Sequence, residues 1–144
     1  MRLGFLATVA IVVAAPVLAQ APERQAVEAA MADSAAGWNA GDIQRFMAVY
    51  SDAPETSFVT AGEILRGKAV MSARYITKYS FDDPAKRGVL SFTTLDFRRL
   101  GPIHALYIGR YLLTYAGGKT ASGPTSLVFV KAKTGWKIIA DHSS

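Results

Sequence analysis

The chain has 144 residues, of which 51% are hydrophobic and 19% are charged, so it can form one domain with a substantial core. The absence of cysteine excludes disulfide bonds, thiolate metal sites and cysteine nucleophiles. The formal net charge is +5. Because Lys and Arg are scattered along the chain, this charge predicts no nucleic-acid partner.

Residues 1–19 have the pattern of a secretory signal peptide. Arg2 precedes an apolar run from Leu3 to Ala15, and Pro16 separates this run from the small residue Ala19. The run is shorter than the about 20 residues of a membrane-spanning helix. We predict cleavage after Ala19, a single domain over residues 20–144, and a periplasmic or secreted protein with no membrane attachment after cleavage. The alternatives are cleavage after Ala21 and an uncleaved anchor.

The next part of the chain predicts three amphipathic helices. The first carries an apolar stripe at helical spacing, formed by Val27, Met31, Ala35 and Trp38. Gly41 ends this helix, and Asp42 caps a second one whose apolar face holds Ile43, Phe46, Met47 and Tyr50. The third helix begins at Gly67-Lys68 and carries Met71, Tyr75 and Tyr79.

The remaining segments predict strands. Residues 57–60 and 63–66 form two short arms around Ala61-Gly62, and residues 89–99 form a longer strand. The apolar residues of this strand change parity, which predicts a bulge near Thr93-Thr94. Residues 103–115 are expected to be the longest strand, and a hairpin from Thr125 to Ser144 completes the sheet. Helices followed by a bent antiparallel sheet indicate an α+β fold.

Several motifs carry a resemblance to a known family. They are Trp38-Asn39-Ala40-Gly41-Asp42, Phe46 to Tyr50, Gly109-Arg110-Tyr111, Gly135-Trp136-Lys137-Ile138 and Asp141-His142-Ser143-Ser144. Together they resemble the NTF2-like superfamily, and within it the SnoaL-like and DUF4440 branch, which is similar to the association domain of calmodulin-dependent kinase II. The resemblance implies a conical barrel in which N-terminal helices pack on a strongly curved antiparallel sheet. Its members are often homodimers and range from isomerases and cyclases to non-catalytic scaffolds.

Two residues are candidates for acid-base catalysis. In a regular strand, His142 shares a face with Trp136, Ile138 and Ala140, so it could line a cavity. The alternative is a histidine at the strand end near solvent. Asp141 then points to the opposite face, toward an interface or rim. Asp96 is the one carboxylate well inside a predicted sheet strand, although it could instead pair with Arg98 or Arg99.

The candidate ligand-binding residues are one cation and four aromatic side chains. Arg110 lies in an apolar strand, where a guanidinium needs a carboxylate or an anionic ligand, and it matches a cavity arginine of the kinase association domains. The alternative is an ion pair with Asp96 or Glu63. The aromatic candidates are Trp38, Tyr50, Tyr75 and Tyr79. The two histidines lack acidic companions at ligand spacing, so we predict no metal site and no cofactor.

Three functions are compatible with these observations. The first is an exported protein that binds a small apolar or weakly acidic ligand in a conical cavity. The second is a cofactor-independent isomerase, dehydratase or cyclase that uses His, Asp or Tyr of the same cavity. The third is a dimeric interaction module without chemistry. A homodimer is expected in each case, because the strands 103–115 and 127–130 are apolar on both faces.

Overall fold

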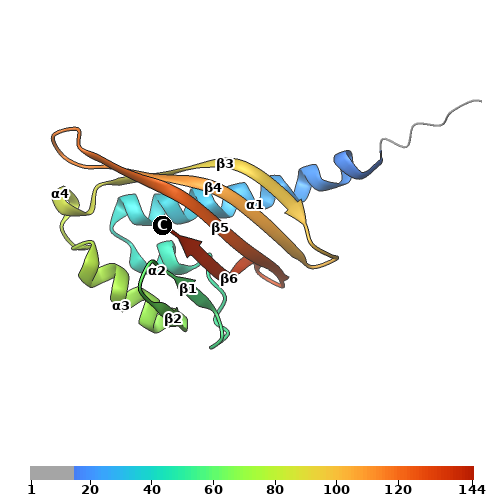
Figure 1. Cartoon of the computed structure of the whole chain (residues 1–144), viewed down its shortest axis with the longest axis horizontal. Helices are drawn as coiled ribbons and strands as arrows, with labels where there is room; N and C mark the ends of the chain where they lie inside the picture. The colour runs from blue at the N-terminus through green and yellow to red at the C-terminus, as the bar shows by residue number, and fades with distance from the viewer. Residues whose placement is uncertain (1–14) are drawn as a thin grey trace, which may run out of the picture.

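The computed structural model describes residues 15–144 of the chain. The predicted signal peptide, residues 1–19, falls largely outside this range. The first helix, α1 (Ala15–Ala40), begins before the predicted start, with Pro22 inside it (Figure 1). Among the described helices, none is both long enough and apolar enough to cross a membrane.

The end of α1 follows the prediction from the sequence. The stripe of Val27, Met31, Ala35 and Trp38 is buried. Gly41 adopts a φ of 73°, a left-handed conformation that suits glycine and turns the chain out of the helix. The side chain of Asp42 then accepts a hydrogen bond from the Arg45 backbone N–H and caps α2 (Ile43–Met47).

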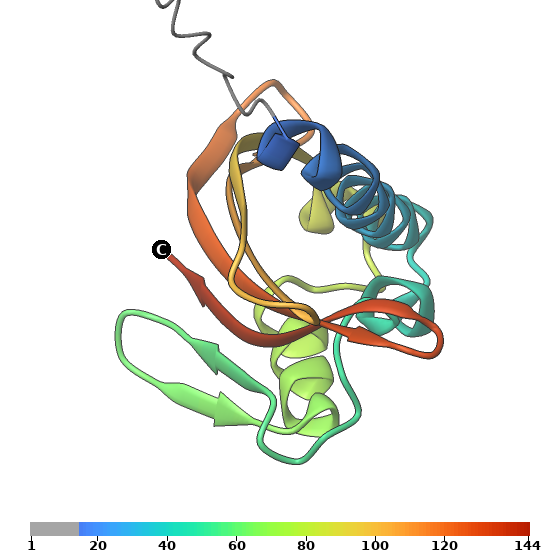
Figure 2. The same cartoon turned by 90° about the vertical axis from the view of Figure 1, so that its right-hand side faces the viewer.

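A short hairpin and two further helices come next. The hairpin consists of β1 (Ser57–Val59) and β2 (Ile64–Arg66), as predicted. It is followed by α3 (Lys68–Lys78), which buries Met71 and Tyr75, and by the short α4 (Pro84–Arg87), which Asp83 caps. Figure 2 shows α3 beside this hairpin, below the curved sheet.

Four longer strands complete one six-stranded sheet. They are β3 (Val89–Arg99), β4 (His104–Thr114), β5 (Thr120–Ala132) and β6 (Gly135–Ser143), and the spatial order is β2-β1-β6-β5-β4-β3. All pairings are antiparallel except that of β1 with β6, which is parallel, so the sheet is mixed rather than purely antiparallel. The longest strand is β5, with 13 residues, and not the predicted strand at 103–115.

Two bulges decide which side chains face the helices. In β3 the register shifts between Thr94 and Asp96, so that Leu95 is the extra residue; this confirms the bulge predicted nearby. In β6, Val128 pairs with Ala140 while Phe129 pairs with Ile138, which makes Ile139 the extra residue. No pattern in the sequence marks this second bulge.

The helices cover the concave side of the sheet and enclose one core. Figure 2 shows α1 crossing that side of β3, β4 and β5. Trp38 donates its indole N–H to the Gly88 carbonyl oxygen, and the Asn39 side chain makes two hydrogen bonds to the backbone of Leu90. These contacts attach the end of α1 to the edge strand β3. The predicted α+β conical barrel is therefore confirmed.

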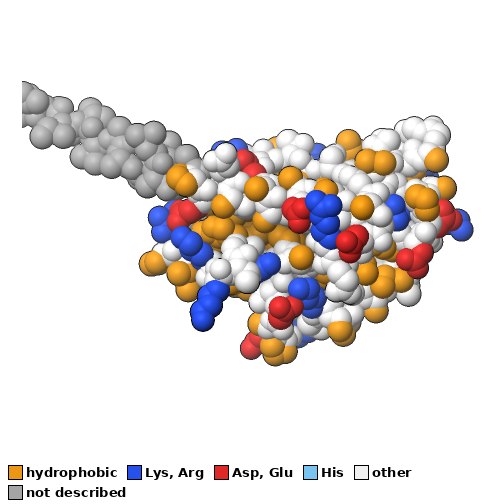
Figure 3. All heavy atoms as spheres, turned by 180° about the vertical axis from the view of Figure 1, so that it is seen from behind, with side chains coloured by type: hydrophobic (Ala, Val, Ile, Leu, Met, Phe, Trp, Pro, Cys, Tyr) orange, Lys and Arg blue, Asp and Glu red, His pale blue; other side chains and the backbone are white. Residues whose placement is uncertain are grey.

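The outside of the barrel carries charges of both signs. On the face seen in Figure 3, Lys and Arg side chains are interspersed with Asp and Glu, and hydrophobic side chains lie between them. The ion pairs include Arg45–Asp33 at 2.6 Å and Arg24–Glu28 at 2.9 Å. No extended surface of a single sign is visible on this face.

Candidate functional site

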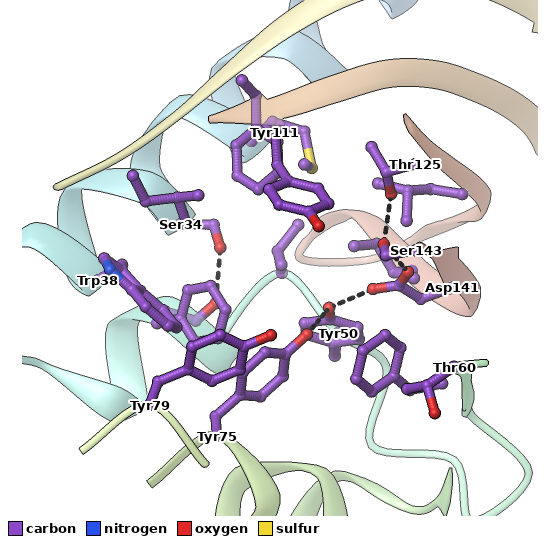
Figure 4. A pocket seen from close by; sticks show the side chains of 18 of the residues that line it. Ser34, Trp38, Tyr50, Thr60, Tyr75, Tyr79, Tyr111, Thr125, Asp141 and Ser143 are labelled. Atoms are coloured by element: carbon purple, nitrogen blue, oxygen red, sulfur yellow. Dashed lines mark hydrogen bonds between the residues drawn. The ribbon is translucent and has the colours of Figure 1, made fainter. Parts of the chain in front are cut away.

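A cavity of about 240 Å³ lies between the helices and the concave side of the sheet. Its walls come from α1, α2, β1, α3 and the four long strands (Figure 4). Most of the lining side chains are apolar or aromatic. The exposed residues Ala61, Lys78 and Ser144 are also part of the lining, which places the opening near the β1–β2 turn and the end of α3.

One buried carboxylate faces this cavity. Asp141 lies in β6, opposite Leu127 of β5, and only 4% of its surface is exposed. Because Ile139 is an extra residue, the alternation of side chains changes after Ile138. Asp141 and Ser143 therefore face inward together with Trp136 and Ile138, although a regular strand would turn them outward.

Four hydroxyl groups surround Asp141 (Figure 4). The Tyr50 hydroxyl donates to Asp141 Oδ2 at 2.6 Å, and the Ser143 hydroxyl donates to Oδ1 at 2.6 Å. The Tyr75 hydroxyl lies 3.2 Å from that of Tyr50, and the Thr125 hydroxyl lies 2.8 Å from that of Ser143. Side chains from α3, the segment after α2, β5 and β6 thus converge on one carboxylate.

The surroundings shift the pKa of these groups upward. Burial raises the pKa of the Asp141 carboxyl above its ordinary value, while the hydrogen bonds from Ser143 and Tyr50 and the charge of His142 act in the opposite direction. Burial also raises the pKa of Tyr50 and Tyr75 well above the ordinary tyrosine value. The two tyrosines are therefore neutral donors, and Asp141 is the acidic group of this cluster.

Aromatic rings form the wall next to this cluster. Tyr75 stacks on Phe58 with ring centres 5.5 Å apart and on Tyr79 with ring centres 5.9 Å apart. Trp38 meets Tyr75 and Tyr79 edge to face. Interlocked rings of this kind hold their positions, so the wall is preformed for an apolar ligand.

The structure brings the four predicted aromatic residues together. Trp38, Tyr50, Tyr75 and Tyr79 all line the cavity. The cavity is also lined by Asp141, Ser143 and Thr125, for which the sequence predicted no role in it. The inward position of Asp141 and Ser143 depends on the bulge at Ile139, and both parities of the surrounding segment are apolar, so no pattern in the sequence marked it.

The two predicted catalytic residues do not line the cavity. His142 lies exposed on the outer face of β6, because the bulge at Ile139 exchanges the two faces of the strand for the residues after it. The prediction that His142 shares a face with Trp136 and Ile138 is wrong. Asp96 pairs with Ile108, whose side chain is on the outer face of β4, and forms an ion pair with Arg98 at 2.6 Å. This is the alternative that the sequence left open for Asp96.

Arg110 also lies on the outer face. In β4 the buried residues are Ala105, Tyr107, Gly109 and Leu113, so the odd-numbered positions face inward. Arg110 is exposed, and the expectation that it points into the cavity is wrong. The cause is that β4 is apolar on both faces, so its pattern did not distinguish inside from outside. The proposed partners Asp96 and Glu63 pair with Arg98 and Arg74 instead.

Nothing in the described chain forms an evident metal site. Within residues 15–144, no three side chains among His, Cys, Asp and Glu come together as ligands. The inner polar groups of the cavity are one carboxylate and several hydroxyls, and Lys78 lies at its opening. The carboxylate and the hydroxyls can bind a ligand by hydrogen bonds and can transfer a proton.

The sequence also matches a family model. A model described as a SnoaL-like domain matches residues 27–144, which includes every strand and all helices except the first turns of α1. The chain belongs to the SnoaL-like family. The predicted SnoaL-like relationship is thereby confirmed. No protein of curated function matches the sequence.

Solved structures place this SnoaL-like domain in the NTF2-like superfamily. An NTF2-like protein of unknown function from Shewanella oneidensis is 26% identical, with a TM-score of 0.77 over 84% of this chain and 98% of that one. A ketosteroid isomerase-like protein from Erwinia carotovora is 19% identical, with a TM-score of 0.62 over 85% of this chain and 95% of that one. The latter likeness, below 25% identity, shows the fold alone.

A third neighbour matches the predicted resemblance to the kinase. It is a protein from Thiobacillus denitrificans that carries the name of a calcium/calmodulin-dependent protein kinase type II association domain. It is 22% identical, with a TM-score of 0.67 over 81% of this chain and 92% of that one. In the SnoaL-like domain described here, the Trp38-to-Asp42 motif has a structural role, since it joins α1 to β3 and caps α2.

Proposed function

We propose that this SnoaL-like domain binds a small, largely apolar molecule in its cavity, with Asp141 fixing the orientation of the ligand. The observation that carries this proposal is the cavity of about 240 Å³ that has aromatic walls and a single buried carboxylate. Pockets for drug-sized ligands have about 300–1,000 Å³, so a ligand of one or two rings is the better fit here.

A pair of variants tests this proposal. Leu113 lines the cavity, whereas its neighbour Leu112 lies on the outer face of β4 and is 39% exposed. Calorimetric titration with the bicyclic alcohol 2-indanol is expected to show binding to the native chain and to Leu112→Phe, but not to Leu113→Phe, where the larger side chain fills the cavity. Equal binding by both variants, or none by the native chain, would contradict the proposal.

A second candidate function is proton transfer to and from a carbon atom. It is favoured by the raised pKa of Asp141, which brings a carboxylate closer to the basicity that a general base needs. Asp141 would accept a proton from a carbon next to a carbonyl group. The electron pair of that C–H bond would move to the carbonyl oxygen as an enolate, and the proton would return to the same or another carbon.

The enolate needs a hydrogen-bond donor, and Tyr79 offers one. Its side chain lines the cavity beside Tyr75, and its hydroxyl has no hydrogen-bond partner among the described residues. Proton exchange of 2-indanone in D₂O, followed by NMR, tests this role. The native chain should accelerate the exchange by about 10²–10⁴-fold over buffer, and Asp141→Asn should not. Equal exchange with both proteins would exclude Asp141 as the base.

We also propose export by cleavage after Ala19. Cleavage there would leave Pro22 in the first turn of α1, where a proline costs no helical hydrogen bond. The measurement is intact-mass analysis of the chain secreted by an expressing cell. A mass that begins at Gln20 supports the proposal, and a chain that keeps Met1 contradicts it.

A homodimer through the outer sheet face is a further proposal. Leu106 of β4 pairs with Val128 of β5, which pairs with Ala140 of β6, and all three are only partly buried. These neighbours form one apolar strip on a face that no described helix covers. A second copy that presents the same strip would remove it from water.

A further inference from the structure

The hydroxyl protons around Asp141 all point toward its carboxylate. Tyr50 and Ser143 each donate their single proton to Asp141. In the contact between Tyr75 and Tyr50 the proton must therefore come from Tyr75, and in the contact between Thr125 and Ser143 it must come from Thr125. The network is thus polarised in one direction, from its outer members toward the carboxylate.

This polarisation decides what the network offers to a ligand. An ionised carboxylate can accept about four hydrogen bonds, and two of those on Asp141 are occupied. The remaining lone pairs of Asp141, together with those of Tyr75 and Thr125, are acceptors. A ligand group that reaches this end of the cavity must donate hydrogen bonds, because another acceptor would meet lone pairs only.

The two charged side chains of the described cavity wall differ in depth, with the cation at the opening and the carboxylate inside. Lys78 is the one Lys or Arg among the described residues that line the cavity, and it is exposed at the opening. Its ammonium group lies 5.6 Å from the centre of the Tyr79 ring, a distance at which the ring face attracts a cation. Deeper in the cavity, Asp141 is the one charged side chain among the described lining residues, so a ligand cation that reaches it meets a negative charge.

We infer that the ligand is an organic ammonium ion, a protonated amine on a body of one or two rings, whose N–H groups bind Asp141 while its apolar part lies against the aromatic wall. This inference rests on the proposed binding function and narrows it to one class of ligand. It replaces the weakly acidic ligand expected from Arg110, since that residue lies outside the cavity. Burial raises the pKa of Asp141, so the ionised carboxylate lacks solvation that a bound cation would supply.

Three probes with one ring system test the inference by calorimetric titration at pH 7.5. They are 2-aminoindane, which is a cation; indane, which has no polar group; and indane-2-carboxylate, which is an anion. We expect 2-aminoindane to bind about ten- to a hundredfold tighter than indane, as a charged hydrogen bond in a buried site allows. Asp141→Asn should remove this advantage and leave indane binding within about twofold.

A matched variant controls for the change in net charge. Asp96→Asn removes a carboxylate on the outer face and should leave all three affinities unchanged. Indane binding by Asp141→Asn reports that its cavity is intact; if that variant does not fold, the comparison of the three probes on the native chain still decides.

The possible failures are distinguishable. If indane and 2-aminoindane bind equally well, the binding function stands and the inference about ammonium ligands is wrong. If indane-2-carboxylate binds most tightly, the cavity selects anions, with Lys78 as the cation, and the inference is again wrong. If none of the three binds, the proposed function fails and the inference fails with it.

Discussion

The ionised carboxylate of Asp141 should reduce the stability of the fold at neutral pH. Burial raises its pKa, so the folded chain holds the proton more tightly than the unfolded chain, whose carboxyl has the ordinary pKa of 3.8. Between the ordinary and the raised pKa the folded state binds more protons than the unfolded state, and stability therefore falls as the pH rises. Below the ordinary pKa the carboxyl is neutral in both states and the penalty is absent.

The size of this effect follows from proton linkage. Within that pH window the contribution of Asp141 to the free energy of unfolding falls by up to about 1.4 kcal/mol per pH unit, and above the raised pKa it is constant. The hydrogen bonds from Tyr50 and Ser143 favour the ion by about 1.5–3 kcal/mol each, so burial must outweigh both for the pKa to be raised.

The assay compares the native chain with Asp141→Asn by urea unfolding between pH 4 and pH 8. The asparagine is neutral throughout, so it changes stability by a constant amount, and the difference between the two proteins isolates the titration of Asp141. This difference should move in favour of Asp141→Asn as the pH rises and then level off. Both proteins are also measured with His142→Gln, because the charge of His142 acts on Asp141.

One result would refute this reasoning. If the native chain becomes more stable relative to Asp141→Asn as the pH rises, the hydroxyl groups outweigh burial and the pKa of Asp141 is lowered in the fold. The carboxylate would then be satisfied without a ligand, which would also weaken the case for a bound cation.

Three further predictions concern the scaffold. Asn39→Ala removes both hydrogen bonds to the Leu90 backbone and should lower the free energy of unfolding by about 1–3 kcal/mol, with Asn39→Asp, which keeps the acceptor, losing less. Gly109→Ala would place a Cβ 2.6 Å from the Tyr107 ring and should lower the free energy of unfolding by about 1–3 kcal/mol. Gly62→Ala has open space around it and should lower this free energy far less. Equal melting temperatures of the two variants would contradict the packing of Gly109 against Tyr107. Ile108→Lys on the outer sheet face should convert a dimer to a monomer in sedimentation, and Thr114→Lys on the same strand should not; a monomeric native chain would exclude the dimer.

Local signals in the sequence predicted much of the architecture. Apolar spacing located the buried stripe of α1 that ends at Trp38, and Gly41 and Asp42 marked where the chain turns into α2. The bulge in β3 was visible because Leu90 and Leu95 have different parities, and the structure has its extra residue at Leu95. In each case the signal and the structure depend on residues close together in the chain.

The candidate site depends on features that local patterns do not carry. In β6 the bulge lies at Ile139, between the apolar residues Ile138 and Ala140. No polar residue there indicates that the following side chains change to the other face of the strand. The same ambiguity in β4 led to the wrong face for Arg110. The parallel pairing of β1 with β6 and the contact between Tyr50 and Asp141 join distant parts of the chain, and they follow only from the packed fold.

The extra residue in β6 also affects how related chains can be compared. Removing Ile139 would restore a regular strand and keep Asp141 and Ser143 facing inward, because the pairing beyond Ala140 would be unchanged. Straightening the strand without removing a residue would instead exchange these two side chains for their neighbours His142 and Ser144. The presence or absence of the bulge, with no change in the residues of the strand, therefore decides whether a carboxylate or an imidazole faces the cavity. Sequences of this family should be aligned on the bulge before their cavity residues are equated.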